Sequence, residues 1–283
     1  MDVCIRKFDL PRRSLTGRTG PRVVRHGASL TTLAVALLMA GGPALANDPS
    51  AKAPKSDPWS AALREGYDAY NSGQKNEAFE AYRYAAENGK LGARWAMARM
   101  YARGEGVERN DYEAFKSYMA IVEQGVEPGS GEDAYLADAL VAAAGYLRSG
   151  IPDSPVRPNP GLAQEFYRDA ATLYRNPVAQ YELGRMLIKT DDAAGSLRQA
   201  GNWLKLAASN GHAGAQAMLG SLWYRSGKIV RGLAMMTAAL EKASPVDRPW
   251  IVTMQEEAFS LASEADRRTA VALAQDMVKK ADK

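Results

Sequence analysis

The sequence contains very little cysteine and histidine, the residues on which most nucleophilic and zinc sites depend. Its 283 residues include one cysteine, Cys4, and only one histidine beyond the first 46 residues, His212. A Ser-His-Asp or Cys-His arrangement would have to be built around that single histidine, and a zinc site would consist mostly of carboxylates. We therefore expect no catalytic set, no metal site and no cofactor, and hence a protein that is not an enzyme.

Two other short patterns also fall short of a functional site. Asp191-Asp192 and Glu256-Glu257 are adjacent acids without the alternating spacing of a calcium-binding loop. Gly104-x-Gly106 lacks the third glycine and the preceding strand of a nucleotide-binding turn. We interpret the acids as solvated helix ends and faces, and the glycines as a connecting loop.

The chain has no excess of one charge once its first segment is set aside. Residues 1–46 contain seven of the 36 Lys and Arg residues and two of the 32 acids, which leaves 29 basic and 30 acidic residues. A near-neutral remainder argues against a nucleic-acid partner. Aromatic residues make up only 8% of the chain and alanine recurs at apolar positions, which favours packed helices over sheet.

Residues 1–46 have the pattern of a cleavable signal peptide. A basic region extends to Arg25, an apolar run covers Leu30 to Ala40, and Ala44-Leu45-Ala46 forms the cleavage site. The run is shorter than the ~20 residues of a membrane span. We expect cleavage after Ala46, no membrane span in the mature chain and a flexible linker over 47–58. The Arg12-Arg13 pair lies far from the apolar run, which favours general secretion over the twin-arginine route without deciding between them.

One pattern recurs beyond the linker. An aromatic residue or leucine is followed at +3 and +4 by Ala-Ala and at +7 by glycine. Two copies begin at Tyr82 and Leu204, and a third, at Tyr167, has Asn176-Pro177 in place of the glycine turn. Each copy is followed by small and aromatic residues at helical spacing, which indicates a buried helical face. This spacing favours a core role for the Tyr and Trp residues over a stacking platform for sugars or bases.

The repeat predicts an all-α chain of about six helix pairs over 59–283, with turns near 74, 106, 128, 155, 190, 227 and 245. Each pair leaves an apolar face uncovered until its neighbour stacks on it, so the pairs form a solenoid with a long groove. The tail from about 247 lacks the repeated alanines and is typical of capping helices. The segments 125–133 and 148–161 are longer than a bare repeat requires and form two distinctive loops.

Polar side chains that cap helices precede prolines at several expected boundaries. These are Asp57-Pro58, Asn159-Pro160, Asn176-Pro177 and Ser244-Pro245. After the loop at 104–107, the expected N-cap of the next helix is Asn110 or Asp111.

The unit over 78–111, with its Ala-Ala pair, turn glycine and Gly-x-Gly loop, resembles the Sel1-like branch of the tetratricopeptide superfamily. The stretches 80–118, QGVEPGS (124–130), AGYLRSGIPDSPVR (144–157) and 231–261 closely resemble the ExoR family of periplasmic regulators of exopolysaccharide synthesis in alphaproteobacteria. This second resemblance covers nearly all of 76–280. The two resemblances imply a right-handed α-solenoid in the periplasm.

The ExoR-like stretches also imply a partner. They imply a protein that binds the periplasmic domain of a membrane sensor histidine kinase of the ExoS/ChvG type and holds it inactive, until a periplasmic protease degrades the inhibitor. Exopolysaccharide synthesis and motility would then be under its control. The alternative is a periplasmic Sel1-like scaffold or accessory protein for cell-envelope or polysaccharide machinery.

Neither resemblance supplies contact residues, so the candidates come from the loops and the groove. Glu127, Asp153 and Arg157 lie in the two long loops and are candidates for partner binding. His212 follows a repeat turn at Gly211, where we expect a solvated loop residue, with a pH-sensing role as the alternative.

Overall fold

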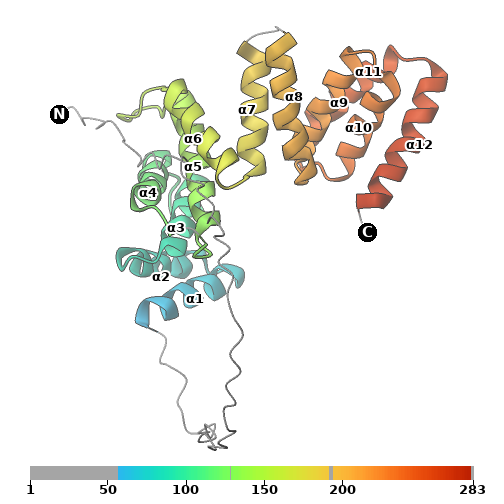
Figure 1. Ribbon diagram of the computed structural model, residues 1–283. Helices are drawn as coiled ribbons and strands as arrows, with labels where there is room; N and C mark the ends of the chain where they lie inside the picture. The colour runs from blue at the N-terminus through green and yellow to red at the C-terminus, as the bar shows by residue number, and fades with distance from the viewer. Residues whose placement is uncertain (1–56, 128, 191–193, 282–283) are drawn as a thin grey trace, which may run out of the picture. The chain divides into compact units, whose positions relative to one another are not determined.

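The structure is a computed structural model that describes residues 57–127, 129–190 and 194–281, and these residues form helices and loops without a strand (Figure 1). The predicted signal peptide, 1–46, and residues 47–56 of the predicted linker lie outside the described residues. The helices are α1 (Pro58–Asn71), α2 (Lys75–Glu87), α3 (Leu91–Arg103), α4 (Asp111–Gln124), α5 (Asp133–Ser149), α6 (Pro160–Thr172), α7 (Pro177–Thr190), α8 (Ala194–Ser209), α9 (Ala213–Arg225), α10 (Ile229–Glu241), α11 (Arg248–Ser260) and α12 (Glu264–Ala281). The all-α prediction is confirmed. Within the described ranges, no helix is both long enough and apolar enough to span a membrane.

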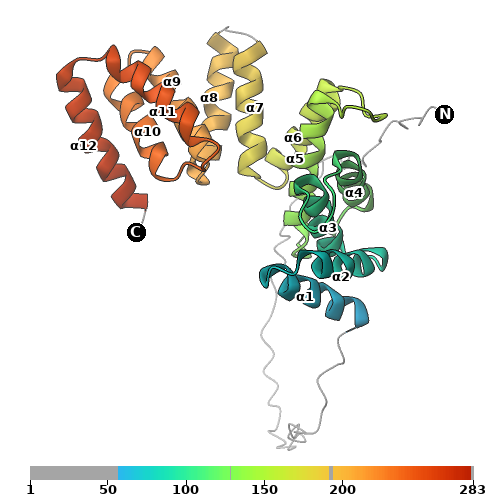
Figure 2. The same ribbon diagram turned by 180° about the vertical axis from the view of Figure 1, so that it is seen from behind.

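The helices pack as successive pairs within one unit of the chain, residues 56–283. Helix α1 packs on α2, α3 on α4, α5 on α6, α7 on α8 and α9 on α10, and the second helix of each pair packs on the first helix of the next. The last two helices depart from this order, because α12 packs mainly against α10 (Figures 1 and 2). The predicted solenoid of helix pairs is therefore confirmed, with an irregular C-terminal end.

The predicted turns coincide with loops of the structure. Those near 74, 106, 155 and 227 lie inside pairs, whereas the one near 128 joins two pairs, between α4 and α5. The turn near 245 precedes α11, and the turn near 190 adjoins residues 191–193, which are not among the described residues.

Three of the four predicted proline boundaries are N-caps with side-chain hydrogen bonds. Asp57 Oδ1 accepts from the Ser60 amide at 2.7 Å, and Asn159 Oδ1 accepts from the Leu162 amide at 3.1 Å. At α7 the acceptor is Asn176 Oδ1, 3.0 Å from the Val178 amide nitrogen. Each proline occupies the first helical turn, where its missing N–H leaves no hydrogen bond unmade.

The prediction at Ser244-Pro245 is wrong in position, because α11 begins only at Arg248. Residues 244–247 form a separate turn in which Ser244 Oγ accepts from the Asp247 amide at 3.1 Å. Between the two alternatives for α4, Asn110 is the N-cap, since its Oδ1 accepts from the Tyr112 and Glu113 amides, and Asp111 is the first helical residue.

The Ala-Ala turns end their helices with a residue in the left-handed conformation. Gly89 and Gly211 both have φ of 84° in the two regular copies. In the third copy the left-handed residue is Arg175, with φ of 52°, and it stands one position later in the repeat. A non-glycine residue there explains how this copy turns without glycine and why its next alanine, Ala179, follows one place late.

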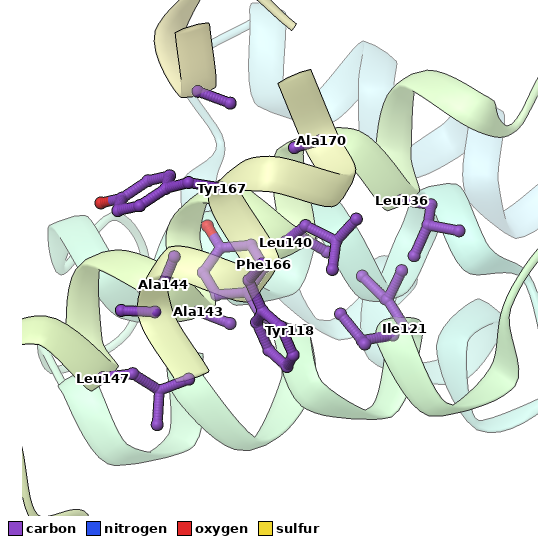
Figure 3. Packing of buried hydrophobic residues seen from close by; sticks show 14 of the residues in the cluster. Tyr118, Ile121, Leu136, Leu140, Ala143, Ala144, Leu147, Phe166, Tyr167 and Ala170 are labelled. Carbon is purple, nitrogen blue, oxygen red and sulfur yellow. The ribbon is translucent and has the colours of Figure 1, made fainter. Parts of the chain in front are cut away.

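The core is a row of clusters at the junctions between pairs. The largest extends from α3 to α7 and contains Ile121 of α4, Leu140 of α5 and Phe166 of α6, of which Ile121 and Phe166 are at most 1% exposed (Figure 3). Separate clusters join α1 to α3, α7 to α10 and α10 to α12. Alanines on the facing helices let the backbones approach closely. Each cluster is covered only by the helix pairs next to it.

The backbones of α9 and α10 approach each other closely at Gly220 and Gly232. A Cβ atom on Gly232 would lie 2.6 Å from the Gly220 carbonyl oxygen and 2.6 Å from the Tyr224 amide nitrogen. Because these are backbone atoms, the helices would have to separate to accept any side chain.

We predict that Gly232→Ala lowers the free energy of unfolding by about 1–3 kcal/mol, the usual cost of overpacking. Urea denaturation of the variant checks this. The matched control is Gly201→Ala in α8, where a Cβ meets nothing within 4 Å. This change should leave stability equal or raise it by up to ~1 kcal/mol, since alanine is the better helix former. Equal effects at both positions would contradict the packing argument.

Candidate partner-binding surface

The first helices of the central pairs, α3, α5 and α7, share a set of partly exposed aromatic and charged side chains. We call this set the junction surface and define it by Trp95, Arg99, Asp138, Arg148, Tyr181, Glu182 and Arg185. Helix α3 contacts α5 directly, and side chains of α5 bond to α7 and to the residue that caps it. The surface therefore follows the row of first helices across two junctions.

An aromatic ring and an arginine one turn later occur twice on this surface. The guanidinium carbon of Arg99 lies 4.5 Å from the centre of the Trp95 ring, and that of Arg185 lies 5.9 Å from the centre of the Tyr181 ring. We call each ring and its arginine a module. The spacing of four residues places the two side chains of a module on one helical face. In α3 and α7 these modules hold equivalent repeat positions, two and six residues after the buried alanines Ala93 and Ala179.

Asp138 of α5 lies near Trp95 and Arg99 of α3 and bonds to the residue that caps α7. Its Oδ1 accepts a hydrogen bond from Asn176 Nδ2 at 3.2 Å, so α5 is joined to the cap of α7. The residue as a whole is exposed, yet its carboxyl group is partly desolvated between α3 and α5. This burial raises the pKa of the carboxyl group, and hydrogen bonds from Asn176 and Trp95 and the charge of Arg99 oppose the shift.

Glu182 binds two guanidinium groups at the next step along the surface. Its Oε2 lies 2.7 Å from Arg148 Nη1 of α5 and 2.6 Å from Arg185 Nη2 of its own helix. The Glu182 side chain is 14% exposed, whereas that of Arg148 is 39% exposed. With Arg99 and Asp138 included, three guanidinium groups face two carboxylates, which gives the junction surface a small positive excess.

His212 lies at the C-terminal edge of this surface and is not the solvated loop residue that the sequence suggested. Its imidazole stacks on the Tyr181 ring with centroids 4.4 Å apart and planes at 22°. Its Nδ1 accepts a hydrogen bond from the Ala215 amide at 3.1 Å, so the ring is the N-cap of α9. No sequence signal marks this role, because histidine is not among the preferred capping residues.

Burial lowers the pKa of His212, and the nearby carboxylate of Asp247 opposes that shift. Asp247 is itself held by Trp250, whose Nε1 donates to Oδ1 at 3.1 Å. The proton on Nδ1 would remove the acceptor of the α9 cap, so protonation of His212 and capping exclude each other.

The three loop candidates are all exposed, but the structure does not bring them together. Glu127 lies in the loop before α5, and Asp153 and Arg157 lie in the loop after it. Helix α5 has 17 residues, which separates its two ends by about 25 Å. Asp153 and Arg157 can therefore belong to one contact, while Glu127 belongs to another edge of the molecule.

Curated relatives with this sequence pattern have a common name. The chain is 49% identical over 256 residues to the exopolysaccharide production negative regulator of Rhizobium meliloti (strain 1021), covering 90% of this chain and 94% of that protein. It is 44% identical over 251 residues to the protein of the same name from Rhizobium leguminosarum bv. viciae, covering 89% and 94%. The chain belongs to the family of exopolysaccharide production negative regulators. No family model matches the chain.

Solved structures similar to this family member support the Sel1-like fold. A Sel1 repeat protein from Oxalobacter formigenes matches with a TM-score of 0.58 at 23% identity, covering 79% of this chain and 88% of that one. A protective antigen of uropathogenic Escherichia coli with an SLR fold matches with a TM-score of 0.61 at 24% identity. The match covers 78% of this chain and 46% of the antigen, so the chain spans less than half of that protein.

Sequence reasoning missed most of the junction surface of this regulator family member. Helical spacing predicts a core role for the Tyr and Trp residues, and Trp95 and Tyr181 do pack against buried clusters, but both remain partly exposed. The signal that could have found them is the arginine four residues after each ring. Among the residues that the structure describes, no group of three or more His, Cys, Asp or Glu side chains is arranged to hold a metal ion.

We predict that the stability of the chain falls as the pH is lowered from 7, through His212. Because its folded pKa lies below the unfolded value of about 6.5, the unfolded chain binds the proton first, and stability falls between these two pKa values as the pH decreases. Urea denaturation across that range, compared between the wild type and His212→Asn, measures the effect.

The asparagine variant keeps a capping acceptor but cannot titrate. Because the stack on Tyr181 is lost, its free energy of unfolding at pH 7 should be lower by about 0.5–1.5 kcal/mol. Its stability should also depend less on pH. Tyr181→Phe is the control, because it keeps the stack and should keep the wild-type slope. The same slope in His212→Asn would show that another group is responsible.

Proposed function

We propose that this chain is a periplasmic negative regulator that binds the sensor domain of a membrane histidine kinase and holds it inactive, so that exopolysaccharide synthesis stays repressed and motility is maintained. The observation that carries the proposal is the junction surface, a row of half-buried rings and guanidinium groups across α3, α5 and α7. Partly exposed Trp, Tyr and Arg are the side chains that most often dominate protein interfaces. The relatives' common name supports the repressive direction.

The chemistry of the surface supports protein binding rather than catalysis. Its rings and guanidinium stems can be covered by a partner with little loss of conformational freedom, since Arg99 and Arg185 are already placed over the Trp95 and Tyr181 rings. Among the described residues there, Arg148 and Arg185 bond to Glu182, Asp138 accepts from Asn176 and Arg99 lies over the Trp95 ring, and none of these groups is a nucleophile beside a base. We propose a non-enzymatic inhibitor whose removal by a periplasmic protease releases the kinase.

Deletion of the gene tests the regulatory part of the proposal. Exopolysaccharide output should rise and swimming should fall, and the wild-type gene should restore both. If deletion leaves exopolysaccharide unchanged while the purified chain is retained on murein or polysaccharide, the scaffold role is the correct one.

We predict that Arg99→Glu weakens binding of the kinase sensor domain by roughly tenfold or more, the range found for central interface arginines. Arg99 makes no ion pair among the described residues, so its replacement leaves no carboxylate without a salt-bridge partner. The measurement is titration of the purified sensor domain, with the thermal midpoint recorded in parallel.

The matched control is Arg168→Glu on α6, an exposed arginine on the second helix of a pair. It makes the same charge change away from the junction surface and should bind as the wild type does. Equal affinity for both variants would place the contact elsewhere, and absence of binding by the wild type would reject the kinase as partner.

A further inference from the structure

A pocket lies beside the junction surface, between α3, α4, α5 and the long loop at 150–159. It has a volume of about 470 Å³, within the range of ~300–1,000 Å³ that small-ligand sites occupy. Its apolar wall consists of small or short side chains, among them Ala102, Ala142 and Ile151. Its polar groups are Arg109, Asp111, Tyr118, Tyr146 and Ser149.

The loop that forms one wall of the pocket is held in place by its own hydrogen bonds. The Ile151 amide donates to the Val156 carbonyl at 3.0 Å, and Ser154 Oγ donates to the Ile151 carbonyl at 2.9 Å. Ile151 and Val156 are 7% and 9% exposed, so the loop has a small core of its own. The wall is therefore formed before any ligand binds, which lowers the entropic cost of binding.

Tyr118 supplies an unused hydroxyl group to this pocket. The residue is 5% exposed and lines the pocket, yet among the described residues its hydroxyl has no hydrogen-bond partner. No fully buried side-chain oxygen in the described part of the chain lacks a partner, so this hydroxyl has accessible surface, and the pocket is the open space that Tyr118 lines. Burial raises the pKa of Tyr118 to about 12, so the hydroxyl is a neutral donor at neutral pH, as tyrosine ordinarily is.

The ionised lining groups neutralise each other. Arg109 Nε and Nη2 bond to the two Asp111 oxygens at 3.2 and 3.0 Å, and Tyr146 donates its hydroxyl hydrogen to Asp111 Oδ1 at 3.3 Å. These bonds leave Arg109 Nη1 as a further donor and free lone pairs on Asp111 as acceptors. A charged ligand would find no unpaired counter-charge among the lining residues and would lose its hydration without compensation.

We propose that this pocket binds a neutral sugar of one or two rings. Such a ligand carries hydroxyl groups that both donate and accept, which matches the Tyr118 and Ser149 hydroxyls and the Arg109–Asp111 pair. Its C–H faces match the alanine, isoleucine and proline wall. The pocket lies at the junction of two helix pairs, and Asp111 of α4 already bonds to Tyr146 of α5, so a bound sugar bridges these pairs and stiffens them. This site is independent of the kinase proposal.

Saturation-transfer NMR with the full purified chain tests the site, using D-glucose and D-galactose as neutral probes and D-glucuronate as the anionic one. At least one neutral sugar should bind. Tyr118→Phe should weaken that binding about 3- to 10-fold, the effect of one neutral hydrogen bond, without unfolding the chain, because its hydroxyl bonds to nothing in the folded protein.

Ala142→Leu, which fills the pocket from α5, should abolish binding, and an unchanged thermal midpoint shows that the variant folds. Tyr181→Phe is the matched control, since it removes a tyrosine hydroxyl outside the pocket and should bind the sugar as the wild type does. No binding of either neutral sugar, binding of glucuronate alone, or equal binding by Tyr118→Phe overturns the proposal.

Discussion

Close approach of neighbouring helices through alanine and glycine is the constraint on which the rest of this structure depends. A helix pair with a small-residue face cannot bury enough apolar surface alone, and it becomes stable only when the next pair covers it. At Gly220 and Gly232 the backbones of α9 and α10 meet with no room for a methyl group. The large side chains are therefore displaced to the junctions, where Phe166 and Ile121 are buried and Trp95 and Tyr181 remain accessible.

The fold could be predicted largely because its signals are local. Ala-Ala pairs, turn glycines and Asx side chains before proline each act within a few residues, and Asp57, Asn110, Asn159 and Asn176 cap the helices as expected. The predicted cap at Ser244 is wrong because a serine hydroxyl can close a separate turn as readily as it caps a helix. Arg175 shows the same limit, since nothing in the sequence marks a non-glycine residue in the left-handed conformation.

The candidate site could be predicted far less well, because its contacts join residues about one repeat apart. Asp138 and Asn176 are separated by 38 positions, and Arg148 and Glu182 by 34. Periodicity indicates which face of a helix is buried, but not which polar side chains meet across a junction. For the same reason the length of the two loops suggests Glu127 and Asp153 as candidates but does not show that they lie at opposite ends of helix α5.

The C-terminal arrangement has a consequence for how the chain opens. Since each pair is held only by its neighbours, local opening should begin at the ends and proceed inward. Helix α12 packs mainly on α10, so it lies over the glycine-packed α9–α10 pair and protects it from one side. Amide hydrogens of α9 and α10 should consequently exchange more slowly than those of α1 and α2, which lie at the N-terminal end of the described helices. The two ends of the described row of helices thus differ in susceptibility to proteolysis, and a protease that requires an unfolded segment would engage α1 and α2 before α9 and α10.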